Sequence, residues 1–497
     1  MKATVYLDTH FESGTVDRRI FGGFLEHLGR AVYEGVYDPG NPRSDARGFR
    51  KDVLDVLRPL GMPLVRYPGG NFVSQYDWRD GIGPRDARPA RPDFAWRSIE
   101  PNQFGVDEFV DWCRELGAEP LMAVNLGTGA PKDAAELLEY CNLGRGTYWA
   151  DRRAANGHPE PLAVRTWCLG NEMDGPWQAG HVPAEVYAQR AQQAAKLMKG
   201  LDPSIELVVC GSSGRFMATY MDWDRRVLEY CWNDVDYISA HRYSGNHAND
   251  SARFLAEGRE IDRILEEYTG LLAYVRAACK SARQVFLSFD EWNVWYKNHE
   301  ADGRWTRAPH LLEEVYNLED ALVCAQYLNS FIRHAGVVKI ACLAQIVNVI
   351  APILTRADGV LIQSIYYPFL MLSRSARGQS LVPSVECPAY ELKDLGAVPW
   401  LDVAATYDAA VGTAFVSLVN RSLVETIIVD VRPADVTFER VVRSEILSGP
   451  DAKAANSWEQ PGVIVPRGGD ARLADGGLQV TVPPLSLAVV DLGVKGR

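Results

Sequence analysis

The sequence lacks any long apolar run. Over its 497 residues, no window approaches the roughly 18 uncharged apolar residues that span a bilayer. The N-terminus, MKATVYLDTHFESGTVD, has no basic segment followed by a sustained apolar stretch, so we expect no signal peptide. Both absences argue against a membrane-spanning or exported protein.

Positive charge is also in short supply. The chain carries 52 Lys and Arg against 64 Asp and Glu, a formal net charge of −12. An acidic surface repels phosphate backbones, which argues against nucleic acid and anionic membranes as partners. The nine cysteines are scattered without a C-x-x-C pair. They predict buried thiols in a reducing cytoplasm rather than a disulfide framework.

Several common site motifs are missing. The segment LGTGAPKDAAELL (126–138) contains glycines and opens a helix, but it lacks both G-x-x-x-x-G-K-[ST] and G-x-G-x-x-G. There is no H-E-x-x-H, and the histidines lack the spacing of zinc ligands. A G-x-S-x-G nucleophile elbow is absent as well. These absences argue against nucleotide binding, zinc chemistry and serine hydrolase chemistry.

What the sequence does contain is a repeated alternation of a short apolar run, a polar or glycine-bearing stop, and a segment of helical period. Continuous apolar strands alternating with helices predict a parallel sheet covered on both faces. The eight runs are 20–27, 63–70, 120–127, 164–172, 205–213, 235–243, 285–292 and 338–348. The clearest predicted helices are 48–60, 106–116, 133–141, 183–201, 259–282 and 312–334.

Eight strands are enough to close a (β/α)₈ TIM barrel. A doubly wound open sheet is the alternative. The barrel is favoured because all eight runs end on polar residues, and a barrel brings every such end to one face. An open sheet would gather only those near its switch point.

The pattern changes after about residue 385. Short alternating runs at 413–420, 425–431, 439–447 and 478–492 predict an antiparallel β-sandwich. We expect the N-terminal run 3–9 to add a strand to it. The predicted domains are therefore a barrel over 15–384 and a sandwich made of 1–14 plus 385–497. The proline-rich segment 81–96 predicts a long loop over the barrel mouth.

Two glutamates stand at the ends of the fourth and seventh predicted strands. Glu172 follows TWCLGN and Glu291 follows VFLSFD. In a barrel both side chains point toward the axis at the same end. Cleavage of a glycosidic bond needs such a pair, one carboxyl protonated and the other ionised, and their proximity itself separates their pKa values. The alternative for each is a structural salt bridge.

The neighbouring residues favour a sugar site. Asn171 offers an amide to a hydroxyl group, and Trp292 and Trp295 offer flat apolar faces. Other strand ends add Glu26, His27, Arg66, Asn71, His241, Tyr243, Gln345 and Asn348. Each alone predicts a structural role, and His27 and His241 by default predict buried histidines bonded to backbone. Together at one barrel mouth they predict a ring of hydrogen-bonding groups.

Five segments resemble the α-L-arabinofuranosidases of glycoside hydrolase family 51. They are FGGFLEHLGRAVYEGVY, RYPGGNFVSQYDWRDGIGP, TWCLGNEMDGPW, LSFDEWNVWY and KIACLAQIVNVIAPI. The resemblance implies a catalytic barrel with a β-sandwich, and retaining double displacement without metal or organic cofactor. It also implies an enzyme that removes terminal non-reducing arabinofuranosyl residues from arabinan- or arabinoxylan-derived oligosaccharides. Members are often cytoplasmic hexamers.

The resemblance also assigns roles to residues. Glu172 would be the acid/base and Glu291 the nucleophile, supported by Arg66 and Tyr243. The arabinose pocket would comprise Glu26, Asn71, Asn171, Tyr243, Trp295 and Gln345. One departure is HRYSGN, where the family often has Gln at Arg242 and a bulky residue at Ser244, so leaving-group preference stays open.

Two other functions also stay open. The same barrel could act on another glycoside, such as a xyloside or a β-1,4-glucan, or the chain could be a non-catalytic sugar-binding protein. Linkage preference among α-1,2, α-1,3 and α-1,5 bonds is not encoded in a readable way.

Overall fold

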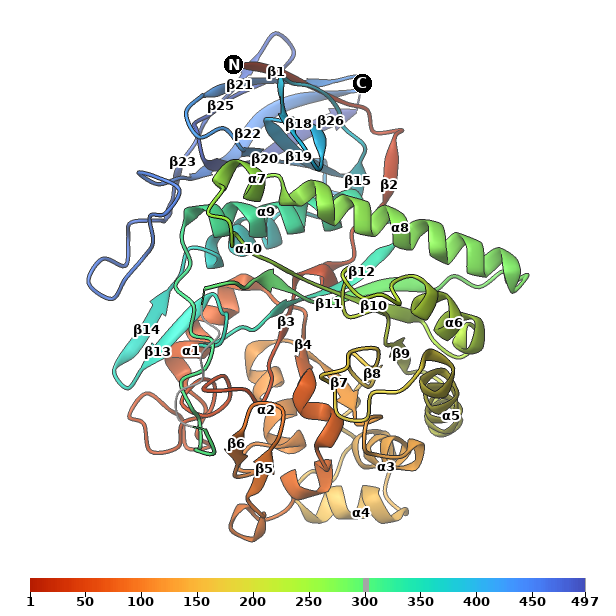
Figure 1. The fold of residues 1–497 in the computed structure, drawn as a ribbon. Helices are drawn as coiled ribbons and strands as arrows, with labels where there is room; N and C mark the ends of the chain where they lie inside the picture. The colour runs from red at the N-terminus through yellow and green to blue at the C-terminus, as the bar shows by residue number, and fades with distance from the viewer. Residues whose placement is uncertain (298–303, 497) are drawn as a thin grey trace.

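The computed structural model describes residues 1–297 and 304–496, which form a closed parallel barrel and a β-sandwich above it (Figure 1). The barrel closes because the last strand pairs with the first, with Cys342 opposite Gly22 and Ala344 opposite Phe24. The open-sheet alternative is therefore wrong. The strands are β3 (Gly22–Phe24), β4 (Leu64–Tyr67), β7 (Glu119–Val124), β8 (Thr166–Leu169), β9 (Glu206–Val209), β10 (Tyr237–Ser244), β11 (Phe286–Val294) and β12 (Val338–Ala344).

A helix follows each barrel strand, as the alternation predicts. These helices are α1 (Lys51–Leu57), α2 (Val106–Leu116), α3 (Pro131–Asn142), α5 (Ala184–Leu201), α6 (Asp222–Cys231), α8 (Glu257–Ala278), α9 (Leu318–Arg333) and α10 (Tyr366–Ser373). Smaller elements are α4 (Tyr148–Ala155), α7 (Ser251–Phe254) and the hairpins β5 (Arg91–Asp93) with β6 (Ser98–Glu100), β13 (Ile353–Arg356) with β14 (Gly359–Ile362), and β17 (Ala389–Leu392) with β18 (Gly396–Pro399).

Helix α9 begins later than the predicted start at residue 312. Asn317 caps it, since its side chain accepts from the backbone N–H of Asp320 (3.1 Å) and the Asp320 carboxylate accepts from the N–H of Asn317 (2.9 Å). This reciprocal cap satisfies two donors that a helix start otherwise leaves free, so the helix begins at Leu318. The predicted start was six residues too early, because the apolar residues between 312 and 317 continued the helical period.

The sandwich consists of two sheets. One is ordered β16 (Ser384–Glu386), β1 (Lys2–Leu7), β21 (Ile427–Pro433), β25 (Gly477–Val482), β24 (Asp470–Ala474). The other is ordered β2 (Glu12–Thr15), β15 (Gln379–Leu381), β19 (Leu401–Asp408), β20 (Thr413–Asn420), β26 (Ser486–Gly496), β22 (Val436–Leu447), β23 (Pro466–Gly468). The N-terminal strand β1 joins the first sheet as expected, although it runs parallel to β21. The predicted boundaries at residues 15 and 384 stay a prediction.

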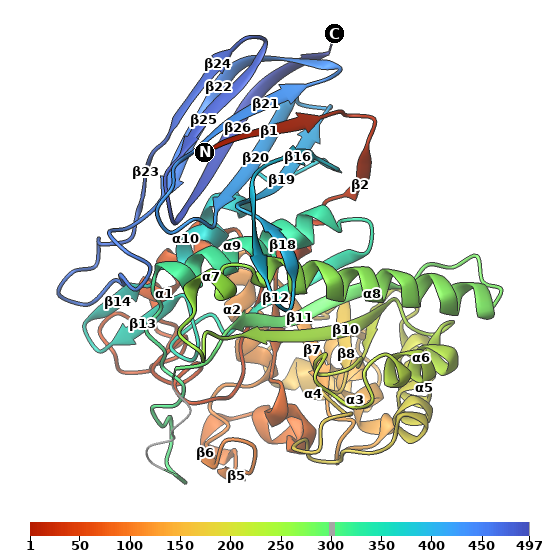
Figure 2. The same ribbon diagram turned by 45° about the horizontal axis from the view of Figure 1, so that its top comes forward.

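Helices α9 and α10 lie between the sandwich and the barrel (Figure 2). Polar contacts join them to the sandwich: Asn329 on α9 donates to the Asp402 carboxylate (2.7 Å), and Arg333 forms an ion pair with it (3.1 Å). Arg421, also buried, pairs with the same carboxylate at 2.9 Å. The sandwich is thus fixed to helices on the outside of the barrel.

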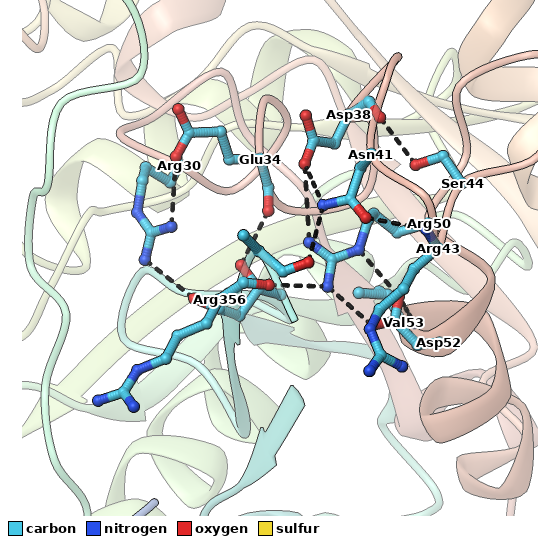
Figure 3. A network of polar contacts seen from close by, with 12 residues as sticks. Arg30, Glu34, Asp38, Asn41, Arg43, Ser44, Arg50, Asp52, Val53 and Arg356 are labelled. Carbon is cyan, nitrogen blue, oxygen red and sulfur yellow. Dashed lines mark hydrogen bonds and ion pairs between the residues drawn. The ribbon is translucent and has the colours of Figure 1, made fainter. Parts of the chain in front are cut away.

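A polar network ties the long connection between β3 and α1 to the β13–β14 hairpin (Figure 3). At its centre Arg50, 1% exposed, donates to both oxygens of the Asp52 carboxylate (2.9 and 2.7 Å). The same guanidinium donates to the carbonyl of Arg356 (3.1 Å). The Arg356 side chain extends away from this network and lies over the ring of Trp458 at 4.2 Å, in a loop of the sandwich.

Within the described ranges, no helix is long and apolar enough to cross a membrane.

Candidate active site

Glu172 and Glu291 lie on one cavity of about 400 Å³ at the carboxyl ends of the barrel strands. Glu172 follows β8 and Glu291 lies in β11. One oxygen of each carboxylate and the Nδ1 atom of His241 all lie within 4.8 Å of one another. The cavity also reaches other predicted pocket residues, namely Glu26, Asn71, Tyr243, Trp295 and Gln345.

A β-bulge turns two consecutive carboxylates of β11 inward. Between the pairs Ser239↔Ser288 and His241↔Glu291 the partner strand advances by two residues and β11 by three. The extra residue breaks the strict alternation of side chains. Asp290 and Glu291 therefore both reach the polar interior of the barrel, where alternation alone would have sent one of them outward.

Two donors hold the Glu291 carboxylate. Arg66, at the end of β4, donates through Nη1 to Oε1 at 2.7 Å, and the Tyr243 hydroxyl donates to Oε2 at 2.9 Å. Burial first, and then the Glu291 charge, raise the pKa of Tyr243 well above its usual value, so the phenol stays a donor. Arg66 is 1% exposed and its guanidinium lies over the Phe24 ring at 4.5 Å. Glu291 is thereby fixed in place with its charge compensated.

Glu172 sits on a sharp turn just beyond β8. Its backbone φ is +42°, in the left-handed region, directly after Gly170 and Asn171. This turn presents the carboxylate to the cavity, where Oε1 lies 2.9 Å from His241 Nδ1 and Oε2 accepts from the Trp177 indole N–H at 2.7 Å. Trp177 was not predicted from the sequence, since it lies on an irregular loop.

His241 connects the carboxylates. Its Nε2 lies 3.1 Å from Asp290 Oδ1, and its Nδ1 lies 3.6 Å from Glu291 as well as close to Glu172. Burial would lower the pKa of His241, but the Glu291 charge and the bonds to Asp290 and Glu172 raise it to about 10. The ring is therefore an imidazolium at neutral pH and donates from both nitrogens. The default expectation of a histidine bonded to backbone was wrong.

Asp290 keeps its charge in this interior. Burial would raise the pKa of Asp290, but the Arg66 guanidinium, 3.7 Å away, and the bond to His241 hold it below its usual value. Glu172, His241 and Glu291 form an ion-pair cluster in which His241 Nδ1 lies 2.9 Å from Glu172 and 3.6 Å from Glu291.

Asn171 presents an unused donor. Its side-chain oxygen accepts from Arg66 Nη2 at 2.7 Å, which fixes the amide so that Nδ2 faces the other way. The residue is 1% exposed, and within residues 1–297 and 304–496 its Nδ2 has no hydrogen-bond partner. Space for a ligand exists there because residue 70 is glycine: a Cβ on Gly70 would lie 2.9 Å from Glu291 Oε1 and 3.5 Å from Asn171 Nδ2.

Glu26 forms a second polar cluster on the same cavity. Its Oε1 accepts from the Phe72 backbone N–H (3.1 Å) and the Trp96 indole (3.0 Å), and Oε2 accepts from the Gln345 amide (3.1 Å). Burial, and then repulsion from Glu291, raise the pKa of Glu26 to about 8. Trp96 follows β5 and lines the cavity, so the segment 81–96 reaches the mouth as predicted.

Some predicted contacts lie elsewhere. Trp292 is 1% exposed and stacks on Tyr327 (centroids 5.1 Å apart), so the prediction that it offers a face to a sugar was wrong. Trp295 does line the cavity, edge-on to Tyr243 at 5.3 Å. Asn348 donates to backbone and Thr355 and has a structural role.

The two departures from the family pattern separate in space. Ser244 is 1% exposed and bonds to the Tyr327 hydroxyl at 2.6 Å, below the surface of the cavity. Arg242 lines the cavity while its guanidinium pairs with the Glu257 carboxylate. Only Arg242 is therefore within reach of a ligand in the cavity.

The chain is similar to known proteins along its whole length. Residues 56–259 match a family model described as α-L-arabinofuranosidase 1 domain, and residues 290–486 match the α-L-arabinofuranosidase C-terminal domain. An intracellular exo-α-(1→5)-L-arabinofuranosidase of Halalkalibacterium halodurans is 45% identical over 100% of both chains. An exo-α-(1→6)-L-arabinofuranosidase of Bifidobacterium longum is 41% identical, over 99% of this chain and 97% of its own.

Solved structures agree. A family 51 α-L-arabinofuranosidase from Bifidobacterium longum superposes with a TM-score of 0.95 at 37% identity, covering 99% of each chain. An α-L-arabinofuranosidase from Thermotoga maritima, solved as an arabinose complex, gives a TM-score of 0.89 at 35% identity, again over 99% of each chain.

Proposed function

Because the chain belongs to glycoside hydrolase family 51, the α-L-arabinofuranosidases, we propose that it is an exo-acting, retaining enzyme. It releases terminal non-reducing α-L-arabinofuranosyl residues from arabinan- or arabinoxylan-derived oligosaccharides. The observation that carries the proposal is the pair of buried glutamates, Glu172 and Glu291, whose nearest oxygens lie within 4.8 Å on one cavity.

The spacing of the pair supports retention. Retaining glycosidases hold their two carboxyl groups about 5–5.5 Å apart, whereas inverting enzymes need about 6.5–9.5 Å to admit a water between them. In this cavity one oxygen of Glu172 and one of Glu291 lie within 4.8 Å of each other, which favours the shorter, retaining separation. We assign the role of nucleophile to Glu291, because Arg66 and Tyr243 hold its two oxygens.

In the first step Glu291 attacks the anomeric carbon while Glu172 protonates the departing oxygen. Arg66 and Tyr243 each hold one oxygen of Glu291, so the carboxylate enters the reaction already oriented. The Trp177 indole and His241 orient Glu172 in the same way. A carbon–oxygen bond forms to Glu291 as the glycosidic bond breaks.

In the second step Glu172, now ionised, takes a proton from a water molecule that attacks the same carbon. The bond to Glu291 breaks and arabinose leaves with its configuration retained. Glu172 regains its proton and Glu291 its charge.

The sugar is held by the polar walls of the cavity. The buried Nδ2 of Asn171, which lacks a protein partner in the described part of the chain, is placed to donate to the 2-hydroxyl group, a contact that strengthens as the ring becomes oxocarbenium-like. Glu26, Asn71 and Gln345 hold the other hydroxyl groups, and Trp295 packs on the ring beside Tyr243.

Replacing Glu172 with alanine tests the roles. We expect hydrolysis of oligosaccharides to fall by a factor on the order of 10² or more, since their leaving groups need an acid. A nitrophenyl arabinofuranoside should still react in the first step, and azide should restore release of product. Equal losses on both substrates without azide rescue would refute the acid/base assignment. Nuclear magnetic resonance of the first-formed anomer tests retention.

The alternatives are separated by simple assays. Nitrophenyl xylosides and glucosides test whether the barrel prefers another glycoside. Binding of arabinose without hydrolysis of any furanoside would favour a sugar-binding protein, although binding alone does not need two buried glutamates. The cytoplasmic location and the hexamer stay proposals from the family. Light scattering coupled to size exclusion tests the hexamer.

A further inference from the structure

Two aromatic side chains are exposed side by side at the outer edge of the cavity. Trp177 is 47% exposed and Phe216 is 73% exposed. Their ring centroids are 6.1 Å apart and their planes are tilted by 32°, and both line the cavity that holds Glu172 and Glu291. Single exposed aromatic residues need no explanation, but a contiguous apolar surface at the mouth of a polar site does.

Each ring lies across a glycine. A Cβ on Gly214 would stand 2.4 Å from Phe216 Cε1, and a Cβ on Gly175 would stand 2.5 Å from Trp177 Cε2. Any larger residue at either position would displace the ring above it. The two rings are thus seated on their own loops by local sequence, which is unlike an apolar side chain left free in solvent.

The two loops are also joined to each other. Asp174, on the loop of Trp177, accepts from the backbone N–H of Ser213 at 3.0 Å, and Ser213 begins the turn that carries Phe216. Arg215 is held away from Phe216 because its guanidinium pairs with Glu267 on α8 at 2.8 Å. The relative position of the rings is therefore fixed by the fold.

The spacing of the rings indicates how a ligand would use them. Centroids 6.1 Å apart leave no room for a third ring between them, so Trp177 and Phe216 form one wall rather than a clamp. The inner cavity is lined by carboxylates and amides, and this wall adjoins it beside Glu172, where the glycosidic oxygen must lie. A group stacked on the wall is therefore the part of the substrate that departs.

We propose that Trp177 and Phe216 form a stacking platform for the leaving group, and that Phe216 selects leaving groups with a flat apolar face. Such a face is offered by a β-xylopyranosyl unit, whose chair has all its hydroxyl groups equatorial and only C–H groups on its faces, and by an aryl aglycone. An arabinofuranosyl leaving group has hydroxyl groups on both faces and stacks less well. The inference rests on the proposed function, since it names the partner of the same site.

The test compares four substrates of the wild type and Phe216→Ala. They are an α-L-arabinofuranosyl xylobiose, phenyl α-L-arabinofuranoside, α-1,5-arabinobiose and α-L-arabinofuranosyl fluoride. The fluoride has a leaving group too small to reach residue 216, so each kcat/KM is divided by that for the fluoride. We expect this ratio to fall about threefold to tenfold for the first two substrates, and less for arabinobiose.

Further variants distinguish stacking on a flat ring from contact with any apolar side chain of similar size. Phe216→Tyr should retain the ratios, whereas Phe216→Leu, which is apolar but not flat, should lose them. Gly214→Ala should lower them by displacing the ring. Tyr274→Ala is the matched control, because Tyr274 is 57% exposed on α8 and does not line the cavity.

The outcomes are distinct. Loss for both the xylobiose and the phenyl substrate supports a platform for flat faces, and loss for the phenyl substrate alone assigns it to aryl groups. Ratios unchanged by Phe216→Ala, with hydrolysis intact, overturn the platform and leave the proposed function standing. Failure of the wild type to hydrolyse even the fluoride would overturn the proposed function itself.

Discussion

Replacing Glu26 with glutamine measures how much unfolding free energy the protein loses by burying the Glu26 carboxyl group near Glu291. Glu26 is 3% exposed, and its pKa is raised from the usual 4.5 to about 8, first by burial and then by the Glu291 charge. One oxygen of each carboxylate lies within 3.3 Å of the point where a Cβ on Gly70 would stand. Glutamine has nearly the same shape, keeps an acceptor for the Phe72 and Trp96 donors, and cannot ionise.

The sign of the effect follows from proton linkage. Between pH 4.5 and about 8 the unfolded chain loses the proton of Glu26 while the folded protein keeps it, so the folded state binds more protons and stability falls as pH rises. The contribution of Glu26 is therefore fully present below pH 4.5 and lost as pH rises through about 8. Each unit of pKa difference corresponds to about 1.4 kcal/mol.

Glu26→Gln should accordingly gain stability relative to the wild type as pH rises. The difference in unfolding free energy should grow by about 1.4 kcal/mol per pH unit from pH 5 to pH 8, about 4 kcal/mol in all, and then level off. Urea unfolding followed by tryptophan fluorescence at each pH measures it. Glu439→Gln, at an exposed position of β22, controls for the substitution itself.

Parallel stability curves for the wild type and Glu26→Gln would refute the reasoning. They would mean that Glu26 is ionised in the folded protein at neutral pH, with its charge compensated by the Trp96 and Phe72 donors. A difference that shrinks as pH rises would reverse the sign and refute the reasoning equally.

Two further predictions concern single contacts. Tyr243→Phe removes the hydroxyl that donates to Glu291 and should lower kcat/KM for a nitrophenyl arabinofuranoside by about tenfold to a hundredfold, the range of a hydrogen bond to a charged group. Unchanged kcat/KM would show that Arg66 alone orients the nucleophile. Arg50→Met removes the buried guanidinium that pairs with the partly exposed Asp52 carboxylate, and it should cost about 1.5–3 kcal/mol of unfolding free energy in urea titrations, the range for hydrogen bonds to charged groups. Arg43→Met, whose side chain is 46% exposed in the same network, should cost at most about 1 kcal/mol; equal losses would contradict the argument.

The barrel could be predicted because its strands are buried on both faces. Such strands are continuous apolar runs, and all eight runs became the eight strands. Helix α10 was missed for the related reason that YYPFLMLS is apolar on every side and shows no helical period. The start of α9 was missed because a cap overrides periodicity.

The sequence predicted most of the residues that line the cavity, but not the directions of the side chains on its loops. Glu172, Glu291 and Tyr243 could be predicted because strand ends of a barrel converge on one face. Trp177 and Phe216 could not be predicted, since loop backbones set their directions. Trp292 could have been excluded, because a residue next to an inward-pointing Glu291 in a strand points outward.

The charges of the site can be balanced at each stage of the proposed reaction. At the start of the proposed reaction the cations of the site are Arg66 and His241, and the anions that face them are Asp290 and Glu291. Glu172 carries the proton that it will donate. Glu26, with a pKa of about 8, is also protonated. When Glu291 becomes covalently bound to the sugar, its negative charge is lost and Glu172 becomes ionised.

His241 contacts both glutamates, at 2.9 Å from Glu172 and 3.6 Å from Glu291. The negative charge thus moves from one neighbour of the imidazolium to another, and the sum of buried charge stays constant. In the free protein the Glu291 charge is the largest of the influences that raise the pKa of His241 to about 10. In the proposed covalent stage the Glu172 carboxylate, 2.9 Å from the same Nδ1 atom, takes the place of that charge, so His241 faces an anion in both halves of the proposed double displacement.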